Sequence, residues 1–420
     1  MKEVSLVGAT LYGNRGAEAM LSAAIGELRE RHSGLWFNVF SYYPVKDRDL
    51  LASEGVAVYS ATPLFLVTVL GPLALLYRVL GVLRMGAMHR WFPRSVIALA
   101  RSRVLVCLAG VSFIDGRTKF LPFNIATILP AMLLGVPVVK FAQAVGPFDH
   151  WLNRLAARLV LARCRQVFAR GDETFRNLQA VFANGRFYQR ANDAAFLFRP
   201  EHALSRAEAS IKGPLARIEQ LADARKVVGL CPSVVVAKRR AAKGHDYAGE
   251  IAALAERLIS GGHAVVLFPN ATRGDDMDKR HNNDLPLLHE IAERLSGKDD
   301  PFLVLVDQSV NAAQVHDILR ACDAIVTSRF HAMVGALACT QPVMVLGWSH
   351  KYLEVMRLFG QEDMVMDHSR LDVDTMAEKV ADLLADVHRR RQQISDALPA
   401  VQDGARVQFD YLDDLLRDRA

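Results

Sequence analysis

Ser328, Arg329 and His331 follow directly on a short apolar run and offer the clearest chemistry in the sequence. An arginine presents a fork of N–H donors that can bind phosphate or carboxylate through two hydrogen bonds. A histidine takes up or releases a proton near neutral pH. These residue types together predict an anion site with acid–base capacity. The structural alternative is an arginine held in an internal ion pair and a histidine that caps a helix.

The segments around these residues predict one βαβ unit. Residues 324–327 form an apolar, β-branched run, 333–339 form a small-residue helix, and 342–346 form a second strand. The polar residues then lie at the carboxyl end of a strand, which is the edge of an open α/β sheet where ligands bind. The start of the helix adds backbone N–H groups that attract anions.

A glycine-rich turn near the N-terminus is a second candidate for anion binding. Gly8, Gly13 and Gly16 lie between an apolar strand at 4–7 and a helix at 17–28. A turn between the first strand and the first helix often holds a phosphate or a nucleotide. The spacing does not match G-x-G-x-x-G, and no Walker lysine follows. A tight turn that needs glycine for its backbone geometry is therefore an equal alternative.

Other charged residues are predicted at strand ends in both halves of the chain. Asp115 and Arg170 each follow a strand of the first half, and Lys238 and Arg239 follow a strand of the second half in a segment expected as a loop. Parallel strands place their carboxyl ends along one edge of the sheet, so we expect these side chains near a ligand site. Simple solvation is the alternative for Lys238 and Arg239.

Residues 63–94 differ from the rest of the chain. An almost wholly apolar run at 63–77 is followed by basic and aromatic residues, namely Arg78, Arg84, His89, Arg90, Trp91, Phe92 and Arg94. Helices that lie on a membrane surface mix these residue types. A membrane span needs about 20 apolar residues, and we expect Gly71-Pro72 to break this run. We favour a membrane-surface element, with a buried helical hairpin as the main alternative and a span as the weakest.

The composition describes a folded protein with more than one core. The chain has 420 residues, of which 51% are hydrophobic and 23% charged, and chains of this length usually form two domains. The net charge of +6 is scattered, which fits an anionic substrate or membrane surface rather than nucleic acid. The five cysteines form no C-x-x-C pair, so we expect neither disulfides nor a metal site. Because Met1-Lys2-Glu3 leads into a strand, we expect no signal peptide and a cytoplasmic location.

The alternation of strands and helices predicts an α/β protein with two Rossmann-like domains facing a cleft. We place the N-terminal domain at 1–200, with the hydrophobic helical insertion at about 62–94. A connector at 201–225 leads to the C-terminal domain at 226–400. The last helix, within 401–420, is expected to return to the first domain. This organisation resembles that of GT-B glycosyltransferases.

Several motifs together resemble the polysaccharide pyruvyl transferase family over most of the chain. They are GNRGAEAM near the N-terminus, the turns AGVSFIDG and AQAVGP, ARGDETF, the Asn192-Asp193 pair and VTSRFHAMVGALACTQPVMVLGWSHKY. The last is the most specific, because the family signature is S-R-[LF]-H-A followed by a small-residue helix, a G-x-P-like turn and a downstream lysine. The residues that match this signature are Ser328, Arg329, His331, Ala332, Pro342 and Lys351.

The chain departs from the family pattern at three places. Ala17 and then Glu18 stand where many members have an aspartate after the glycine of the first turn. The usual Gly-Gly before Asp115 is Ala109-Gly110. Thr340-Gln341 replaces the glycine that usually precedes the proline of the signature. These differences concern substrate contacts more than the fold.

The resemblance implies transfer of pyruvate from phosphoenolpyruvate to sugar hydroxyls of a cell-surface polysaccharide or its lipid-linked precursor. The product would be a pyruvate ketal, and no cofactor or metal is implied. His331 would be the acid, or the group that neutralises the leaving phosphate, and Arg329 would clamp phosphate or carboxylate. Asp115 or Glu18 would orient or deprotonate the acceptor hydroxyl.

The same resemblance implies that the C-terminal domain binds the donor and the N-terminal domain the acceptor. Arg170 would supply a second cation from the N-terminal domain. The other expected substrate contacts are Asn14, Ser328, Gln143, Lys351, Lys238 and Arg239.

Two other functional classes stay open at this point. A GT-B glycosyltransferase that uses a nucleotide sugar would share the fold, and a non-catalytic scaffold of polysaccharide assembly would share the hydrophobic insertion. A peripheral contact of residues 63–94 with the inner face of the cell membrane is compatible with all three. We expect no nucleic-acid partner.

Overall fold

The structure is a computed structural model that describes residues 2–182, 185–274, 276–277, 282–297, 300–347 and 349–417. The chain divides into two compact units. The first contains Met1–Leu11, Met20–Phe198 and Gln402–Ala420, and the second contains Tyr12–Ala19 and Arg199–Val401. The second unit therefore includes Tyr12–Ala19, called the glycine-rich segment below, with Gly13 and Gly16, while Gly8 belongs to the first unit. It also includes residues 201–225, which we expected to form a connector.

The first unit is built on a parallel sheet. Among the described residues, seven strands lie in the order β3-β2-β1-β4-β5-β6-β7. Their β-branched and aromatic runs are largely buried on both faces, as parallel sheets require. The strands are β1 (Lys2–Val7), β2 (Leu35–Ser41), β3 (Val56–Ser60), β4 (Ser102–Cys107), β5 (Val138–Gln143), β6 (Gln166–Arg170) and β7 (Tyr188–Ala191).

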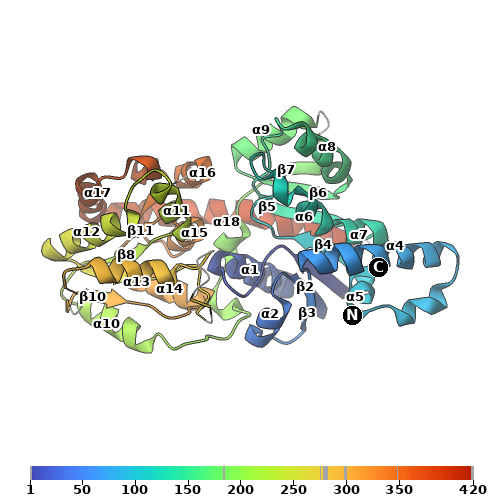
Figure 1. Ribbon diagram of the computed structural model, residues 1–420, viewed down its shortest axis with the longest axis horizontal. Coiled ribbons are helices and arrows are strands. Elements are labelled where there is room, and N and C mark those ends of the chain that lie inside the picture. Colours follow the sequence, from blue (N-terminus) through green and yellow to red (C-terminus); the bar gives the residue numbers. More distant parts are fainter. Residues whose placement is uncertain are drawn as a thin grey trace. The chain divides into compact units, whose positions relative to one another are not determined.

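Helices cover both faces of this sheet (Figure 1). The α-helices are α1 (Arg15–Arg31), which begins in the second unit, α2 (Pro44–Leu50), α3 (Pro63–Phe65), α4 (Gly71–Val82), α5 (Arg94–Arg101), α6 (Leu121–Ala126), α7 (Leu129–Leu134), α8 (Trp151–Val160) and α9 (Asp172–Val181). A π-helical segment, η1 (Leu66–Leu70), joins α3 to α4. The short 3₁₀ turns are η2 (Gly86–Trp91), η3 (Thr118–Phe120), η4 (Leu161–Arg163), η5 (Gly185–Phe187) and η6 (Ala194–Leu197).

The second unit has its own parallel sheet. Within the described ranges, six strands lie in the order β10-β9-β8-β11-β12-β13. They are β8 (Val227–Cys231), β9 (Ala264–Leu267), β10 (Leu303–Leu305), β11 (Ala324–Thr327), β12 (Val343–Gly347) and β13 (Val365–Asp367). The expected strand–helix–strand unit is β11, α15 (Phe330–Ala338) and β12, and its two strands pair in parallel.

The remaining helices surround this second sheet. They are α10 (Lys212–Ala222), α11 (Val234–Ala241), α12 (Tyr247–Ser260), α13 (Leu285–Arg294), α14 (Ala312–Ala321), α16 (His350–Leu358), α17 (Val373–Ala385) and the first part of α18 (Val387–Arg417). Side-chain caps stabilise several of them. At α14, for example, Asn311 and Gln314 form a reciprocal capping box. The 3₁₀ turns are η7 (Pro200–His202), η8 (Glu362–Met364) and η9 (His368–Arg370).

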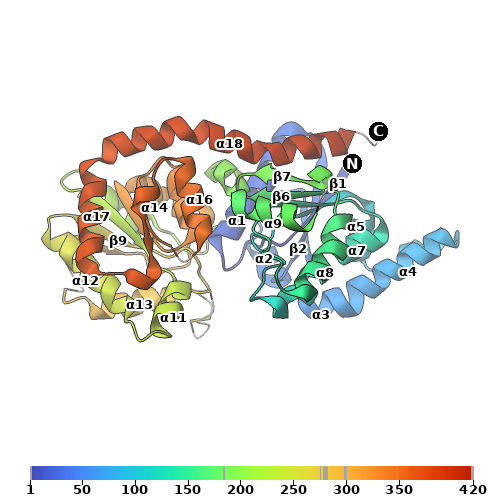
Figure 2. The same cartoon turned by 90° about the horizontal axis from the view of Figure 1, so that it is seen from above.

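The last part of α18 belongs to the first unit. The ring of Phe409 packs edge-on against Phe141 of β5 at 5.1 Å, and Tyr411 packs against Phe168 of β6 at 5.9 Å. The Gln408 side chain accepts a hydrogen bond from the backbone N–H of Ala142. Figure 2 shows α18 as one continuous helix. We expected the last helix within residues 401–420, but it begins at Val387 and continues through Pro399.

Both sheets have a point at which the strand order reverses, and ligands of open α/β sheets bind there. In the first unit this switch point lies between β1 and β4, and in the second it lies between β8 and β11. Gly8, directly after β1, has a φ of +94°, and a Cβ at this position would lie 2.6 Å from the backbone nitrogen of Ala109. Glycine is therefore required where the two strand ends of the first unit approach each other.

The hydrophobic insertion forms one continuous helical run, α3-η1-α4, in place of the expected break at Gly71-Pro72. Pro72 stands in the first turn of α4, where its missing N–H costs little, and the π-helical turn before it carries the chain through. Residues 63–82 are long and apolar enough to cross a membrane by length and composition, and 22% of their most apolar window is buried. The helical run is therefore neither fully buried, as a buried hairpin would be, nor fully exposed.

Candidate active site

The switch point of the second unit gathers most of the predicted site residues. Ser328 and Arg329 follow β11, while Ser233 follows β8 and caps α11 through the N–H of Val235. The Ser328 N–H donates to the carbonyl of Cys231 at the end of β8. The two loops are thus joined directly at the edge where the expected strand–helix–strand unit places its polar turn.

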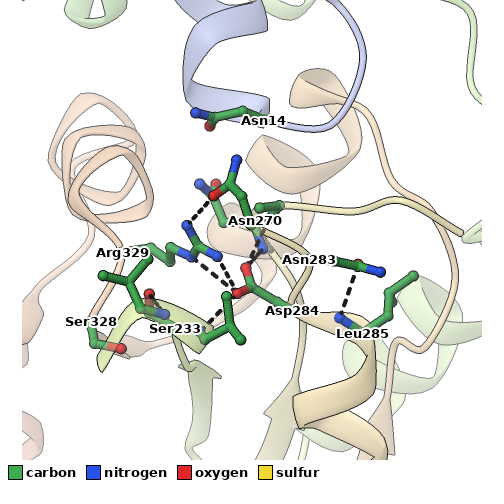
Figure 3. A network of polar contacts seen from close by, with 12 residues as sticks. Asn14, Ser233, Asn270, Asn283, Asp284, Leu285, Ser328 and Arg329 are labelled. Atoms are coloured by element: carbon green, nitrogen blue, oxygen red, sulfur yellow. Dashed lines mark hydrogen bonds and ion pairs between the residues drawn. The ribbon is translucent and has the colours of Figure 1, made fainter. Parts of the chain in front are cut away.

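Asp284 is the centre of the polar network at this edge (Figure 3). Its carboxylate accepts hydrogen bonds from the N–H groups of Val234, Asn270 and Ala271, at 3.1, 3.3 and 2.9 Å. It also binds the Arg329 guanidinium. One buried carboxylate therefore fixes the loop after β8, the loop after β9 and the start of α15 relative to one another.

Arg329 is held as a buried ion pair. Its Nε donates to Asp284 at 3.1 Å, its Nη2 also donates to Asp284, and its Nη1 donates to Asn282 at 2.9 Å. Burial acts against the charge, but Asp284 outweighs it and raises the pKa of Arg329 above the usual range. Among the described residues, three of its five N–H groups are thus engaged, which leaves at most two for a bound anion.

Ser328 is enclosed by two tyrosines. Its hydroxyl lies 2.8 Å from the hydroxyl of Tyr247, and its carbonyl accepts a hydrogen bond from Tyr352 at 3.1 Å. All three residues are buried. Burial raises the pKa of Tyr247, so this phenol stays protonated at neutral pH. The arrangement supports the backbone before Arg329 and gives Ser328 a structural contact in addition to its predicted substrate role.

The glycine-rich segment lies against His331. The backbone of Gly16 is so close to the imidazole that a Cβ on this glycine would overlap the ring. The segment is fixed by Arg15, whose N–H donates to the carbonyl of Asn270 at 3.2 Å and whose guanidinium donates to the carbonyl of Val310 at 2.8 Å. The second unit thus brings together the two most distinctive motifs of the sequence, although they are far apart along the chain.

Asn14 and Glu18 lie on the same segment but have different surroundings. The Asn14 side chain accepts a hydrogen bond from the N–H of Gly16 at 3.1 Å, and Figure 3 shows Asn14 over the Arg329 network. Glu18 is fully buried, forms an ion pair with Arg15 at 3.0 Å and accepts a hydrogen bond from Ser205. Glu18 therefore holds the segment in place, and its burial argues against direct contact with a sugar hydroxyl.

Arg273 belongs to this site and was not among the expected contacts. It is buried, its guanidinium lies 5.1 Å from the centre of the Tyr12 ring, and a Cβ on Gly13 would lie 3.0 Å from it. Its backbone is held by the Asn283 side chain. The signal in the sequence was its place in the charged loop after β9. Nothing there distinguished it from neighbouring charges, because its contacts come from a distant segment.

Lys351 lies beside the histidine turn. Its ammonium is 4.5 Å from the centre of the Phe330 ring, and Phe330 contacts the His331 ring edge-to-face at 5.2 Å. A lysine over an aromatic face is attracted by the ring quadrupole. Lys351 and His331 thus both contact Phe330 and lie in one cluster.

In the first unit, Arg170 is also held in a buried ion pair. Its Nη1 lies 2.5 Å from Asp193, and its Nη2 donates to the carbonyl of Gly110 at 2.8 Å. Asp193 in turn accepts the N–H of Ala195 and so caps η6. Arg170 therefore joins β6, the loop after β4 and the segment after β7.

Asp115 and Gln143 are likewise engaged in contacts within the first unit. The Asp115 carboxylate accepts the N–H groups of Asp149 and His150, at 2.6 and 3.0 Å, and the Asn153 side chain at 2.8 Å. It thereby holds the segment before α8 against the loop after β4. Gln143 is fully buried and accepts a hydrogen bond from the Ser112 hydroxyl. Through these hydrogen bonds, both residues hold loops at the ends of strands in place.

Lys238 and Arg239 lie in the last turn of α11, and the loop expected there is wrong. The physical reason is that Ser233 caps a short helix and that Arg240, next in sequence, is buried against Glu250 and the carbonyl of His368. Lys238 and Arg239 are exposed. Lys238 lines a cavity of about 630 Å³ between α11, α12 and α13.

The described part of the chain contains no group of three or more His, Cys, Asp or Glu side chains that could hold a metal ion. The site in the second unit is instead defined by cations and by one histidine. Its guanidinium groups suit an anionic ligand, and the histidine suits proton transfer.

Comparisons with known proteins cover most of the chain. Residues 14–350 match the family described as polysaccharide pyruvyl transferase. The amylovoran biosynthesis protein AmsJ of Erwinia amylovora is 22% identical over 419 residues, which are 94% of this chain and 95% of that protein. The family match begins at Asn14, inside the glycine-rich segment, and includes Gly16, Asp115, Arg170 and the histidine turn.

Solved structures show the same fold. MnaA of S. aureus, in a co-structure with UDP, has a TM-score of 0.56 and 13% identity, and the match covers 94% of this chain and 91% of that chain. HepE of Anabaena, in complex with UDP and glucose, has a TM-score of 0.56 and 12% identity, with 99% of each chain covered. At these identities the likeness concerns the fold alone, which is GT-B-like with two parallel α/β sheets.

Proposed function

Because this chain belongs to the polysaccharide pyruvyl transferase family, we propose that it transfers pyruvate from phosphoenolpyruvate to hydroxyl groups of a saccharide. The product is a pyruvate ketal, and the acceptor is a cell-surface polysaccharide or its lipid-linked precursor. The family match confirms the resemblance drawn from the sequence motifs. A relative named for amylovoran biosynthesis supports a polysaccharide as the acceptor class.

The observation that carries this proposal is the contact between Gly16 and His331. It joins the glycine-rich segment to the histidine turn at the edge of the second sheet where a ligand is expected. Arg329 lies two residues before the histidine, and Arg273 lies against Tyr12 and Gly13. A histidine beside two guanidinium groups suits a donor that carries a carboxylate and a phosphate and must be protonated during the reaction.

Ketal formation sets the proton balance that the site must handle. The CH₂ carbon of phosphoenolpyruvate gains a proton and becomes a methyl group, and two acceptor oxygens form bonds to the central carbon. The bond between this carbon and the phosphate oxygen breaks, and inorganic phosphate leaves with the electron pair. The two hydroxyl protons of the acceptor balance the new methyl C–H and the proton on the phosphate.

In this scheme His331 is the general acid that supplies a proton. We assign it the protonation of the CH₂ carbon or of the departing phosphate, since general acid–base catalysis contributes about 10²–10⁴-fold. Arg329 and Arg273 bind the two anionic groups of the donor. Asp284 keeps the Arg329 guanidinium in one orientation, which pre-organises the donor site and lowers the entropic cost of binding.

The acceptor side is proposed for the first unit, at the strand ends that carry Asp115, Gln143 and Arg170. These residues are engaged in contacts that shape the loops, so we assign them positioning roles. A general base for the acceptor hydroxyl is not assigned to Glu18, because its carboxylate is buried beside Arg15 and Ser205.

The direct test is incubation with phosphoenolpyruvate and candidate lipid-linked saccharides, followed by phosphate release and product mass. The wild type should release phosphate only with a suitable acceptor and give a product heavier by one pyruvate ketal. His331→Gln should bind phosphoenolpyruvate in calorimetry but lose about 10²–10⁴-fold in turnover, since glutamine cannot transfer a proton. His388→Gln, on the exposed face of α18, is the matched control and should keep full turnover.

Two outcomes would contradict the proposal. One is consumption of a nucleotide sugar with release of nucleoside diphosphate, which would assign the chain to glycosyl transfer. The other is unchanged turnover in His331→Gln, which would reduce this histidine to a structural contact of the glycine-rich segment.

A further inference from the structure

Exposed large hydrophobic side chains concentrate on one group of helices in the first unit. Among the described residues nineteen such side chains are exposed, and sixteen of them lie on α3, η1, α4, the turn through η2, η3, α7 and α8. Ten are in the hydrophobic insertion: Leu64, Val67, Leu75, Leu76, Val79, Val82, Leu83, Met85, Met88 and Trp91. The others are Phe120, Leu129, Trp151, Leu152, Leu155 and Leu159. Scattered apolar residues on a surface need no explanation, whereas a concentration of this kind marks an interaction surface.

The helical run α3-η1-α4 has two distinct apolar faces. Leu66, Leu70 and Ala74 are fully buried in the core of the first unit. Phe65 and Leu73 are half-buried against the same core. Leu75, Val79 and Val82 of α4 recur every three or four residues and are exposed. Leu64 of α3 and Val67 of η1 are exposed as well, and Leu64 and Val82 are 74% and 70% exposed. One face thus attaches the helix to its own unit, and the other is left exposed by the described residues of that unit.

Side-chain contacts hold the turn after α4 against the helix, so the exposed face has a defined structure. The His89 ring stacks on Tyr77 at 3.7 Å and its Nε2 lies 3.0 Å from the Tyr77 carbonyl. Phe92 packs edge-on against Tyr77 at 5.1 Å. These contacts hold η2 back against α4, and they leave Trp91 76% exposed. Figure 2 shows α4 projecting from the other helices of the first unit.

The charge of this region has one sign. No aspartate or glutamate occurs between Glu54 and Asp115, a stretch that contains Arg78, Arg84, Arg90, Arg94, Arg101 and Arg103. Arg90 lies over the Trp91 ring at 5.2 Å. Arg90, Arg94 and Arg101 line one pocket of about 460 Å³ with Trp36 and Tyr59, and Glu3 also lines it. An apolar face bordered by arginines and an exposed tryptophan matches the boundary between acyl chains and anionic head groups.

We propose that this face docks the first unit on the surface of a bilayer that contains anionic phospholipid. The exposed side chains of α4 and Trp91 enter the boundary between head groups and acyl chains, and Arg84, Arg90 and Arg94 contact lipid phosphates. The helix lies on the bilayer and does not cross it, because a span would remove Leu66, Leu70 and Ala74 from the core of the unit. Docking is independent of the proposed function, and only its benefit, access to a lipid-linked acceptor, rests on that function.

The test is co-flotation of the full chain with vesicles, without any substrate. Vesicles of phosphatidylcholine with phosphatidylglycerol should carry the protein to the top of the gradient, and vesicles of phosphatidylcholine alone should carry much less. Raising the salt concentration should weaken the association, because the head-group contacts are screened.

Two triple variants separate the two parts of the surface. R84E/R90E/R94E should lower affinity for the anionic vesicles by about 10²-fold or more, since each basic residue near such a surface contributes roughly fivefold. V67S/V79S/V82S, on the exposed stripe, should lower binding to both kinds of vesicle. The matched controls are R206E/K212E/K243E, with the same charge change at exposed positions of the second unit, and V45S/M277S/L358S, at exposed apolar positions outside these helices. Both controls should bind as the wild type does.

Other results would overturn the proposal. Absence of flotation with anionic vesicles, or equal losses in the controls, would exclude a lipid surface. If light scattering shows a dimer that V67S/V79S/V82S converts to a monomer, and the wild type does not float, the face is a contact between two copies. Calorimetry should also measure the phosphoenolpyruvate affinity of every variant. A variant that no longer floats but still binds phosphoenolpyruvate has lost docking without losing the proposed function.

Discussion

The switch points of the two sheets both contain a buried arginine–aspartate pair, but they differ in the residues that surround it. In the second unit Arg329, after β11, is held by the buried Asp284. In the first unit Arg170, at the end of β6, is held by the buried Asp193, and its guanidinium reaches the loop after β4. In the first unit the pair joins segments of that unit only. In the second unit the glycine-rich segment is packed beside the pair and places Gly16 against His331.

This difference shows that a charged residue at a strand end can have either of two roles, ordering loops or binding a ligand. A buried arginine paired with an aspartate is sufficient to order loops, and by itself it does not indicate a ligand. The second unit has a histidine and further guanidinium groups around the same edge, whereas the first unit has carboxylates and a buried amide that hold its loops there. We therefore expect substitutions at the two switch points to have similar effects on stability and different effects on donor binding.

The largest expected effect is on Asp284. Asp284→Asn removes the charge that balances Arg329, and loss of one partner of a buried pair costs about 3–5 kcal/mol in the free energy of unfolding. Asp193→Asn should cost a similar amount through Arg170. Only Asp284→Asn should weaken phosphoenolpyruvate binding, because it releases the Arg329 guanidinium from its fixed orientation. Urea denaturation and calorimetry measure the two effects.

The control for this pair is Asp172→Asn. Asp172 forms an exposed ion pair with Arg190 at 2.7 Å, and exposed pairs contribute about 0–1 kcal/mol. If Asp193→Asn lowered donor affinity as much as Asp284→Asn, the contrast between the two switch points would be lost.

A smaller effect is expected when the arginines become lysines. A lysine keeps the charge but cannot form hydrogen bonds to Asp284 and Asn282 from three nitrogens. Arg329→Lys should therefore lose about 1.5–3 kcal/mol in the free energy of phosphoenolpyruvate binding. Arg170→Lys should lose its contact with Gly110 and leave donor affinity unchanged. Calorimetric titration with phosphoenolpyruvate measures both, and equal affinity for Arg329→Lys and wild type would remove Arg329 from the donor site.

The two glycines at the switch points provide a third contrast. Gly16→Ala places a methyl group on the His331 ring, and overpacking of this kind costs about 1–3 kcal/mol. It should displace the imidazole, change its NMR signals and lower turnover. Gly8→Ala meets the backbone of Ala109 in a left-handed conformation, so it should destabilise the first unit and leave the His331 signals in place. Gly213→Ala, which has open space around it, is the control.

The sequence predicted the sheets well because their strands are buried runs of β-branched residues flanked by turns. The strands that were not expected are β3 and β13, the edge strands at Val56–Ser60 and Val365–Asp367. Edge strands are covered less completely, so their hydrophobic pattern is weaker. Helix ends were harder to predict where tertiary contacts decide them, as at α11, where buried Arg240 makes part of a helix from a run of charges.

The candidate site was predictable in its residue types but not in its contacts. Arg329 and His331 stood out because strand ends in α/β proteins carry function. The partner of Arg329 is Asp284, from a charged loop that gave no indication of burial, and the partner of His331 is the backbone of Gly16. Both depend on how distant segments meet, which local periodicity does not determine.

The smallest expected effect concerns Asp115, the first unit's candidate for a catalytic carboxylate. In the structure it accepts two backbone N–H groups and the Asn153 side chain at the start of α8. A hydrogen bond to an ionised acceptor contributes about 1 kcal/mol more than one to a neutral acceptor, so Asp115→Asn should lower the free energy of unfolding in urea by about this amount. Because asparagine keeps the shape and one acceptor oxygen, turnover with saturating acceptor should fall less than in His331→Gln. A loss of turnover as large as that of His331→Gln, at unchanged stability, would make Asp115 the general base and give the first unit a chemical role that its contacts do not indicate.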